Sequence, residues 1–193
     1  MIKGIFFDAA DVFYRREEST VAFARRLMRE GGYSTQLAPD EASRLEELHF
    51  QASNGAIGHE QFWHAYLQAH DVAPGERRSA MVRQIGDQAR LVQPMPGAHE
   101  SVEELKARGF LVGIVTDTIY PLSWKMSWLD QAGVAEFVDV VSCSSELGLK
   151  KPDPAIYLDA VRKAKLTVAE SAFVGHDAGE LAGARRAGLS TVA

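Results

Sequence analysis

Short buried runs and helical patterns alternate along this chain, and this alternation restricts its possible folds more than any other feature. The predicted strands share a mostly apolar pattern and cover residues 4–7, 110–115, 137–141, 172–174 and 189–192. The predicted helices between them share apolar residues at helical spacing and cover residues 98–108, 122–132, 154–164 and 179–187. Such alternation produces a parallel sheet with helices on both faces. The sequence therefore predicts an α/β fold with a doubly wound, Rossmann-like parallel sheet.

Four further helical patterns follow the first predicted strand directly. They lie between residues 17 and 91, and the turn at residues 94–97, Pro-Met-Pro-Gly, ends the block. An insertion at this point emerges at the carboxyl edge of the sheet, where open α/β sheets bind ligands. We therefore expect a core formed by residues 1–14 and 93–193 and an inserted α-helical cap subdomain formed by residues 15–92.

Composition restricts the partners and the compartment. The net charge is -5 without a long basic run, which argues against nucleic acid and anionic membrane surfaces as partners. The only cysteine, Cys143, has no internal disulfide partner. Neither a secretory leader nor a run of about 18 apolar residues is present. We expect a cytoplasmic protein, a monomer or homodimer, that binds a small molecule.

Two predicted strands end in polar groups. Asp8 follows the first strand, and Thr116 and Asp117 end the next one. A carboxylate at this edge faces the ligand crevice, and a hydroxyl with backbone N–H groups can bind an anionic oxygen. Each group also has an ordinary explanation as part of a strand-to-loop turn. The two explanations stay open for each residue taken alone.

Two later segments carry charged groups at equivalent places. Lys151 precedes a stiff Pro-Asp-Pro turn, which makes it a better candidate for an inward charge than Lys150. Asp177 and Glu180 follow the strand at 172–174, where two carboxylates suit a hard cation such as Mg²⁺. The alternative is that Asp177 caps the next helix and Glu180 lies exposed in its first turn.

Together these elements resemble the haloacid dehalogenase-like (HAD) hydrolases, in the branch with a helical cap after the first strand. The resemblance covers essentially the whole chain. The matching pieces are a strand ending in Asp8, a strand ending in Thr116, the string Lys151-Pro152-Asp153-Pro154-Ala155-Ile156-Tyr157, and the stretches 173–175 and 183–188. The lysine string and the final glycine-alanine-glycine spacing are the most specific of these motifs.

The resemblance implies a phosphatase that acts on a small phosphorylated metabolite. Asp8 would be the nucleophile and would form an aspartyl intermediate. Thr116 would donate to a phosphoryl oxygen, Asp117 would lie in the same substrate-binding loop, and Lys151 would offset the negative charge. The implied cofactor is Mg²⁺, held by Asp8, the backbone carbonyl of Ala10, Asp177 and Glu180.

Three positions depart from the pattern of this family. Ala10 stands where family phosphatases have a second aspartate, whose acid–base help contributes about 10²–10⁴-fold to the rate. His176 stands in place of a metal-binding aspartate, and imidazole is a poor ligand for Mg²⁺. Asp177 and Glu180 are therefore the expected metal pair. His176 is either an acid–base group or a structural residue. Asp117 replaces an asparagine or small residue and would repel a phosphate unless it turns away.

These departures leave two alternatives to the phosphatase. A metal-independent 2-haloacid dehalogenase would use the same Asp8 without the second aspartate or the metal. A catalytically degenerate HAD protein would use its cleft for binding only. Substrate contacts are expected from Phe13 and Tyr14 at the exit from the first strand and from cap residues such as Phe62, Trp63, His64 and Tyr66. Of these, Phe62, Trp63 and Tyr66 are better explained as cap core. Trp124 and Trp128 are expected to pack rather than to line the site.

Overall fold

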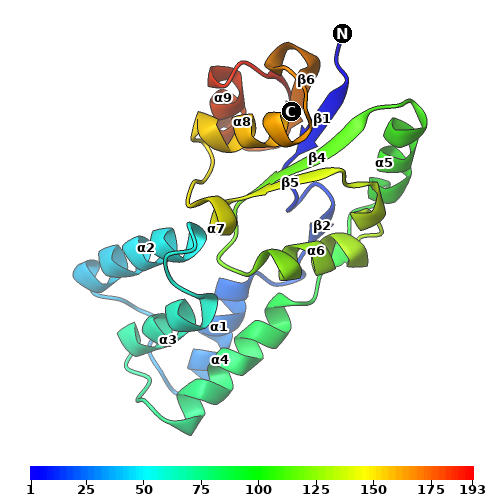
Figure 1. The fold of residues 1–193 in the computed structure, drawn as a ribbon. Coiled ribbons are helices and arrows are strands. Elements are labelled where there is room, and N and C mark those ends of the chain that lie inside the picture. The colour runs from blue at the N-terminus through cyan, green and yellow to red at the C-terminus, as the bar shows by residue number, and fades with distance from the viewer.

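The computed structural model describes residues 1–193, and a five-stranded parallel sheet lies at the centre of the core. Figure 1 shows β1, β4, β5 and β6 of this sheet side by side. The strand order is β5-β4-β1-β6-β7, so the N-terminal strand lies in the middle. The strands are β1 (Gly4–Phe7), β4 (Leu111–Thr116), β5 (Val140–Cys143), β6 (Ser171–Val174) and β7 (Ser190–Val192). All carboxyl ends therefore meet at one edge, with the end of β1 at its centre.

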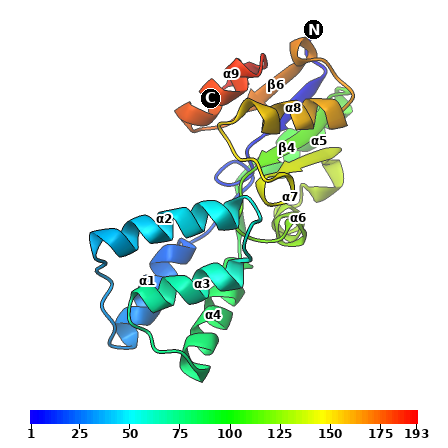
Figure 2. The ribbon, with the colours of Figure 1, turned by 60° about the vertical axis from the view of Figure 1, so that its left-hand side comes forward.

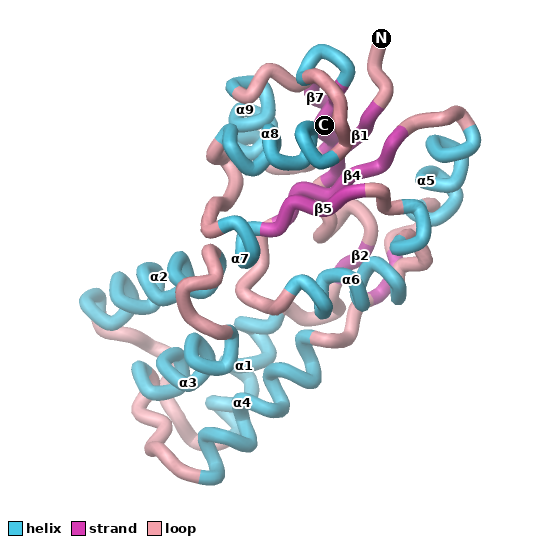
Figure 3. The backbone as a smooth tube through the Cα atoms, viewed as in Figure 1, coloured by secondary structure: helices cyan, strands magenta, loops and turns pink.

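Helices cover both faces of the sheet, as Figure 3 shows with strands in magenta and helices in cyan. One face packs on α5 (Ala98–Ala107) and α6 (Leu122–Gln131), and the other on α8 (Pro154–Lys163) and α9 (Ala178–Arg186). Side chains alternate between the faces along a strand. Phe7 accordingly lies in the α5/α6 core, while Phe6 lies in the α8/α9 core. The predicted doubly wound α/β fold is confirmed.

The predicted strand at 137–141 was placed too early in the chain. Residues Ala135–Phe137 form a short 3-10 helix, and β5 begins only at Val140. The Asp139 side chain accepts the N–H of Val112 at 2.8 Å, and the Asp139 N–H donates to the Val112 carbonyl at 2.8 Å. The Asp139 side chain thus takes the place of a backbone hydrogen bond at the start of the β4–β5 pairing. The spacing of apolar residues does not reveal such a contact. The strand is followed at once by a short helix, α7 (Ser144–Leu147), which was not predicted.

The inserted residues form a separate helical unit beside the carboxyl edge of the sheet (Figure 2). Its helices are α1 (Thr20–Glu30), α2 (Pro39–Ser53), α3 (His59–Ala69) and α4 (Glu76–Ala89). They enclose a core of their own, in which Met28, Trp63, Leu67 and Ile85 are almost fully buried. An antiparallel ribbon of β2 (Tyr14–Arg15) and β3 (Gln93–Pro94) connects it to the core. The inserted helical subdomain is confirmed; its division from the core at 14/15 and 92/93 stays a prediction.

The cap touches the core at several points, and two of these contacts are close. Gly55, just after α2, comes so close to the backbone of Ser145 that a Cβ at residue 55 would lie 2.1 Å from the Ser145 carbonyl oxygen. In α3, the Trp63 indole N–H donates to the Tyr120 hydroxyl across the boundary at 3.2 Å. These contacts hold the cap over the strand ends. None of the helices is long and apolar enough to span a membrane.

Candidate active site

The centre of the site is an ion pair between Asp8 and Lys151. The Asp8 N–H donates to the Val174 carbonyl at 3.0 Å, which continues the pairing of β1 with β6 and places Asp8 at the carboxyl edge of the sheet. Lys151 Nζ lies 2.6 Å from Asp8 Oδ1 and 2.9 Å from Glu180 Oε2. Only 2% of the Lys151 side chain and 10% of the Asp8 side chain are exposed. Two carboxylates therefore share one buried ammonium group.

Neighbouring structure holds Lys151 in this position. Asp153 caps α8 by accepting the N–H of Ala155 at 2.9 Å, and Pro154 starts that helix. A Cβ at Gly183 would lie 2.5 Å from the Pro152 carbonyl oxygen, so α9 packs directly on the turn after Lys151. The stiff turn expected from the sequence is thus fixed between two helices.

The charges shift one another's proton affinities. Burial by itself would lower the pKa of Lys151, but the charges of Asp8 and Glu180 outweigh it and raise that pKa. Burial raises the pKa of Glu180; the Lys151 charge opposes this shift and the Asp8 charge adds to it. One ammonium thus faces two carboxylates, and it does not fully offset the effect of burial on Glu180.

Thr116 has a hydroxyl that no protein group binds. The residue is 1% exposed, and its Oγ1 has no hydrogen-bond partner in the protein. It ends β4, which lies beside β1, so it reaches the same sheet edge as Asp8. A buried hydroxyl without a partner is costly unless a ligand satisfies it. This donor therefore suits an oxygen of a bound anion.

Asp117 turns partly toward the Lys151 loop. Its Oδ1 accepts the backbone N–H of Lys151 at 3.1 Å, so it ties the end of β4 to the turn that carries the ammonium group. Burial raises the pKa of Asp117, although the Lys151 charge opposes this shift. The residue still lines the cleft described below. Its carboxylate thus has a positioning contact that the sequence did not indicate.

The predicted metal ligands do not form one acidic cluster. Asp177 is exposed and caps α9, accepting the N–H of Glu180 at 2.9 Å, and His176 is exposed beside it. The structure contains no group of three or more histidine, cysteine or acidic side chains placed to hold a metal. Asp8 and Glu180 remain as two carboxylates within reach of one lysine. That donor set fits Mg²⁺, which uses one or two protein carboxylates and keeps water or substrate oxygens as its other ligands.

A cleft of about 300 Å³ separates this edge from the cap. It is lined from the core by Ala10, Tyr14, Asp117, Thr118 and Tyr120, and from the cap and its connection by Arg16, Thr20, His49, Phe62 and Trp63, among others. Three basic side chains border it: Arg16, Lys125 and Lys150. An acidic protein thus has a cationic, aromatic cleft that reaches Ala10 and Asp117, close along the chain to Asp8 and Thr116.

Lys125 is the site residue that the sequence analysis missed. It lies in α6, is 3% exposed, and its Nζ lies 3.0 Å from the Tyr14 hydroxyl and 5.1 Å from the centre of the Trp128 ring. Burial lowers its pKa to about 8, while the nearby charge of Asp8 acts in the opposite direction. A sequence signal existed: Lys125 stands three and four residues before Trp128 and Leu129, on the apolar face of its helix.

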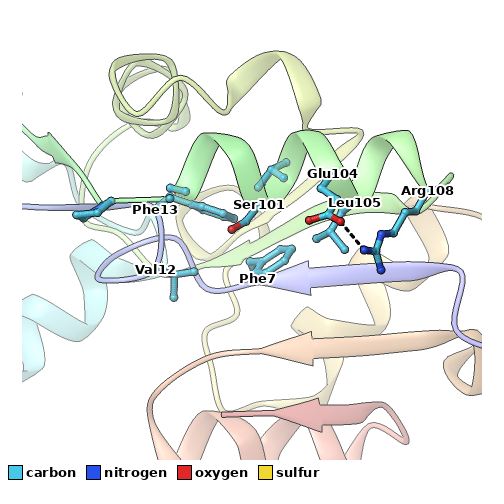
Figure 4. Close-up of a pocket in the computed structure, with 11 residues that line it drawn as sticks. Phe7, Val12, Phe13, Ser101, Glu104, Leu105 and Arg108 are labelled. Atoms are coloured by element: carbon cyan, nitrogen blue, oxygen red, sulfur yellow. Dashed lines mark hydrogen bonds and ion pairs between the residues drawn. The ribbon is translucent and has the colours of Figure 1, made fainter.

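The aromatic residues named from the sequence fall into three places. Tyr14 lines the cleft, Phe62 and Trp63 line it from within the cap core, and Tyr66 belongs to that core without lining the cleft. Phe13 faces a different hollow, which Figure 4 shows between β1 and α5, where it packs near Phe7 with ring centres 5.0 Å apart. That hollow of about 420 Å³ contains none of the predicted catalytic or metal-binding residues, and Phe13 does not line the cleft.

Comparison with known proteins shows the family of this chain. The family described as haloacid dehalogenase-like hydrolase matches residues 2–188. The glyceraldehyde 3-phosphate phosphatase of Methanopyrus kandleri is 29% identical over 198 residues, covering 100% of this chain and 83% of the relative. The (S)-2-haloacid dehalogenase 4A of Burkholderia cepacia is 33% identical over 100 residues, covering 50% of this chain and 41% of the relative.

The fold also matches solved structures. The 2-haloacid dehalogenase from Pseudomonas syringae pv. Tomato DC3000 superposes with a TM-score of 0.70 and 22% sequence identity, over 99% of this chain and 85% of that one. At this identity the likeness concerns the fold alone. With the family match over nearly the full length and the Asp8–Lys151 pair at the strand ends, the chain belongs to the haloacid dehalogenase-like hydrolases.

Proposed function

We propose that this protein is a Mg²⁺-dependent phosphatase of a small phosphorylated metabolite. The observation that carries the proposal is the buried Asp8–Lys151 pair, 2.6 Å apart, beside the unpartnered hydroxyl of Thr116. A carboxylate, an ammonium group and a free donor at one strand edge are the groups that phosphoryl transfer to an aspartate requires.

In the proposed reaction, an oxygen of Asp8 attacks the phosphorus of a phosphomonoester and the ester oxygen leaves. Thr116 donates a hydrogen bond to a phosphoryl oxygen. Lys151 offsets the repulsion between the anionic nucleophile and the anionic substrate, a repulsion that would otherwise slow their approach. Water then hydrolyses the aspartyl-phosphate. Asp8 and Glu180 would hold Mg²⁺, which supplies charge neutralisation to the phosphoryl oxygens when bound.

The cleft and the relatives support a small substrate. The relative from Methanopyrus kandleri, aligned with the whole of this chain, is named for glyceraldehyde 3-phosphate. A second one, from Methanothermobacter thermautotrophicus, carries the same name and aligns over 100% of this chain. A cleft of about 300 Å³ with three basic side chains suits a phosphorylated compound of a few carbons. We propose a small phosphorylated carbonyl compound or acid of this kind.

A panel of phosphomonoesters that includes glyceraldehyde 3-phosphate tests the proposal. Phosphate release is measured with Mg²⁺, with EDTA, and with EDTA followed by excess Mg²⁺. We expect release only with Mg²⁺, and none from Asp8→Asn, which keeps the shape of the side chain but removes the nucleophile. Undiminished activity of Asp8→Asn would rule out the mechanism, and activity that EDTA leaves intact would rule out the metal.

A second candidate function is the hydrolysis of a carbon–halogen bond in a small 2-haloacid. Two observations favour it: the Lys151 ammonium already pairs with both carboxylates, and Ala10 presents only a methyl group to the cleft. This reaction needs no proton for its halide leaving group. Halide release from a racemic 2-chloropropionate sample containing EDTA, lost in Asp8→Asn, would establish it. Release of phosphate without release of halide would exclude the dehalogenase and support the phosphatase.

A further inference from the structure

Tyr14 and Lys125 form a buried pair that the proposed reaction has not yet used. Tyr14 is 1% exposed and Lys125 is 3% exposed, and both line the cleft that also includes Ala10. A charged ammonium group has only donors, so at 3.0 Å Lys125 donates to the Tyr14 oxygen. The Tyr14 proton must then point elsewhere, and no protein atom accepts it. The tyrosine is therefore a free donor at the edge of the cleft.

The cleft lacks an acid where the family resemblance leads one to expect it. Ala10 has no proton to give, and Asp11, the next residue, is exposed and has a positive φ of 58°, while Ala10 lines the cleft. An alkyl phosphate therefore needs another proton source for its leaving oxygen. Tyr14 forms a β-bridge with Ala10, two residues after Asp8, and Ala10, Tyr14 and Lys125 all line the cleft, so the pair lies close to the end of β1 that carries the reacting carboxylate.

We propose that the Tyr14 hydroxyl donates the proton to the leaving group and that Lys125 resupplies Tyr14, in place of an acid at residue 10. This inference rests on the proposed phosphatase function. Tyr14 would be the catalytic residue that contacts the substrate oxygen, and Lys125 would be the positioning residue that acts through it. Trp128 supports the ammonium with its ring face, 5.1 Å from Nζ.

The proton transfers balance over the two steps. An Asp8 oxygen bonds to phosphorus while the bond from phosphorus to the ester oxygen breaks. The ester oxygen takes the Tyr14 proton, Tyr14 takes one from the Lys125 ammonium, and a neutral alcohol leaves. Water then attacks the phosphorus of the aspartyl-phosphate, and the bond from phosphorus to the Asp8 oxygen breaks. The attacking water gives one proton to Tyr14, and Tyr14 gives its own proton to the neutral Lys125 amine. Inorganic phosphate and the Asp8 carboxylate are released, and the pair is restored.

The test compares leaving groups of different basicity. Turnover is measured for p-nitrophenyl phosphate, whose leaving group needs no proton, and for an alkyl phosphate that the wild type hydrolyses. We expect Tyr14→Phe to lower kcat by about 10²–10⁴-fold for the alkyl phosphate and by less than about tenfold for the aryl phosphate. Lys125→Met should show the same split, with KM little changed. Tyr14→Phe is the decisive variant if Lys125→Met does not fold.

A restored acid at residue 10 provides the matched control. In the double variant Ala10→Asp/Tyr14→Phe, we expect the alkyl phosphate turnover lost in Tyr14→Phe to return at least tenfold. Equal losses for both leaving groups, or no loss in Tyr14→Phe, would overturn the inference and leave the phosphatase standing. A wild type that hydrolyses neither ester would overturn both, because the inference depends on the phosphatase.

Discussion

The Lys151 ammonium lies 2.6 Å from Asp8, 143 residues away along the chain, and only 2% of the lysine side chain is exposed. Lys151→Met would leave the Asp8 carboxylate buried without its cation, so we expect a loss of about 3–5 kcal/mol in the free energy of unfolding. Asp8→Asn leaves Lys151 paired with Glu180 and should cost less. Urea denaturation gives both values, and turnover should vanish in both variants.

The double variant is the control for this pair. Asp8→Asn/Lys151→Met removes both charges, so its free energy of unfolding should lie closer to the wild type than that of Lys151→Met. Equal stability of Lys151→Met and the wild type would contradict the buried pair.

Replacing Thr116 by valine should raise the stability of the protein and lower its activity. Thr116→Val has nearly the same shape and removes a buried hydroxyl without a partner, so we expect the free protein to become about 1 kcal/mol more stable. Turnover should fall about 10²–10³-fold, the usual cost of one lost donor to a transition-state oxygen. Thermal unfolding and steady-state kinetics measure the two effects.

Thr118 offers the matched comparison for stability. It is buried too, but its hydroxyl accepts the N–H of Tyr120 at 3.0 Å. Thr118→Val should therefore lose about 1 kcal/mol. If both valine variants shift stability in the same direction, the Thr116 hydroxyl has a partner after all.

Asp117→Asn should strengthen binding of an anionic substrate. The amide oxygen can still accept the Lys151 N–H, while the negative charge is removed from the cleft. Unit charges a few ångströms apart near a protein surface interact by a few kcal/mol, and solvent screening reduces this, so we expect KM to fall about tenfold. An unchanged KM would show that the carboxylate does not face the substrate.

The same variant predicts a pH effect on stability. Burial raises the pKa of Asp117 in the folded protein, so its ionised form costs stability above the folded pKa, and this cost is absent below the unfolded value of about 3.9. Asp117→Asn should therefore be more stable than the wild type at about pH 7 and equally stable near pH 3, as urea unfolding at both pH values can measure.

Gly55 tests whether the close contact between cap and core is needed for activity. It has a φ of 78°, and a Cβ there would collide with the Ser145 carbonyl oxygen, so Gly55→Ala must push the cap away. Gly32 has a similar φ of 81° but open space around it. Each alanine variant should lose about 1–2 kcal/mol from backbone strain, and Gly55→Ala also through the collision. Only Gly55→Ala should reduce kcat/KM, measured with the best phosphomonoester; an equal effect in Gly32→Ala would show that strain alone is responsible.

Much of the candidate site was predictable because parallel strands bring their carboxyl ends together. Once the apolar runs at 4–7 and 110–115 are recognised as strands, Asp8 and Thr116 must reach one edge. The Pro-Asp-Pro turn then indicates that Lys151 points inward, as the structure shows. The roles of these residues, and the metal set of Asp8, Ala10, Asp177 and Glu180, stay predictions.

Other features depended on which groups meet across the fold. Hydropathy did not reveal that Asp139 replaces the first rung of β5, that Asp117 binds the Lys151 backbone, or that Glu180 shares the Lys151 ammonium. Each is a hydrogen bond or ion pair between residues at least 27 positions apart. Local spacing carries no information on such partners.

Local chemistry along the chain was thus sufficient for the alternating elements, the inserted helices and the acid at the end of β1, because turns, caps and apolar periods act over a few neighbouring residues. The burial of Lys125 against Tyr14, 111 positions apart, was decided only when α6 packed beneath the cap connection. The burial and charge environment of a side chain depend on the packed tertiary structure. They alone place Lys125, on the apolar face of its helix, at the cleft.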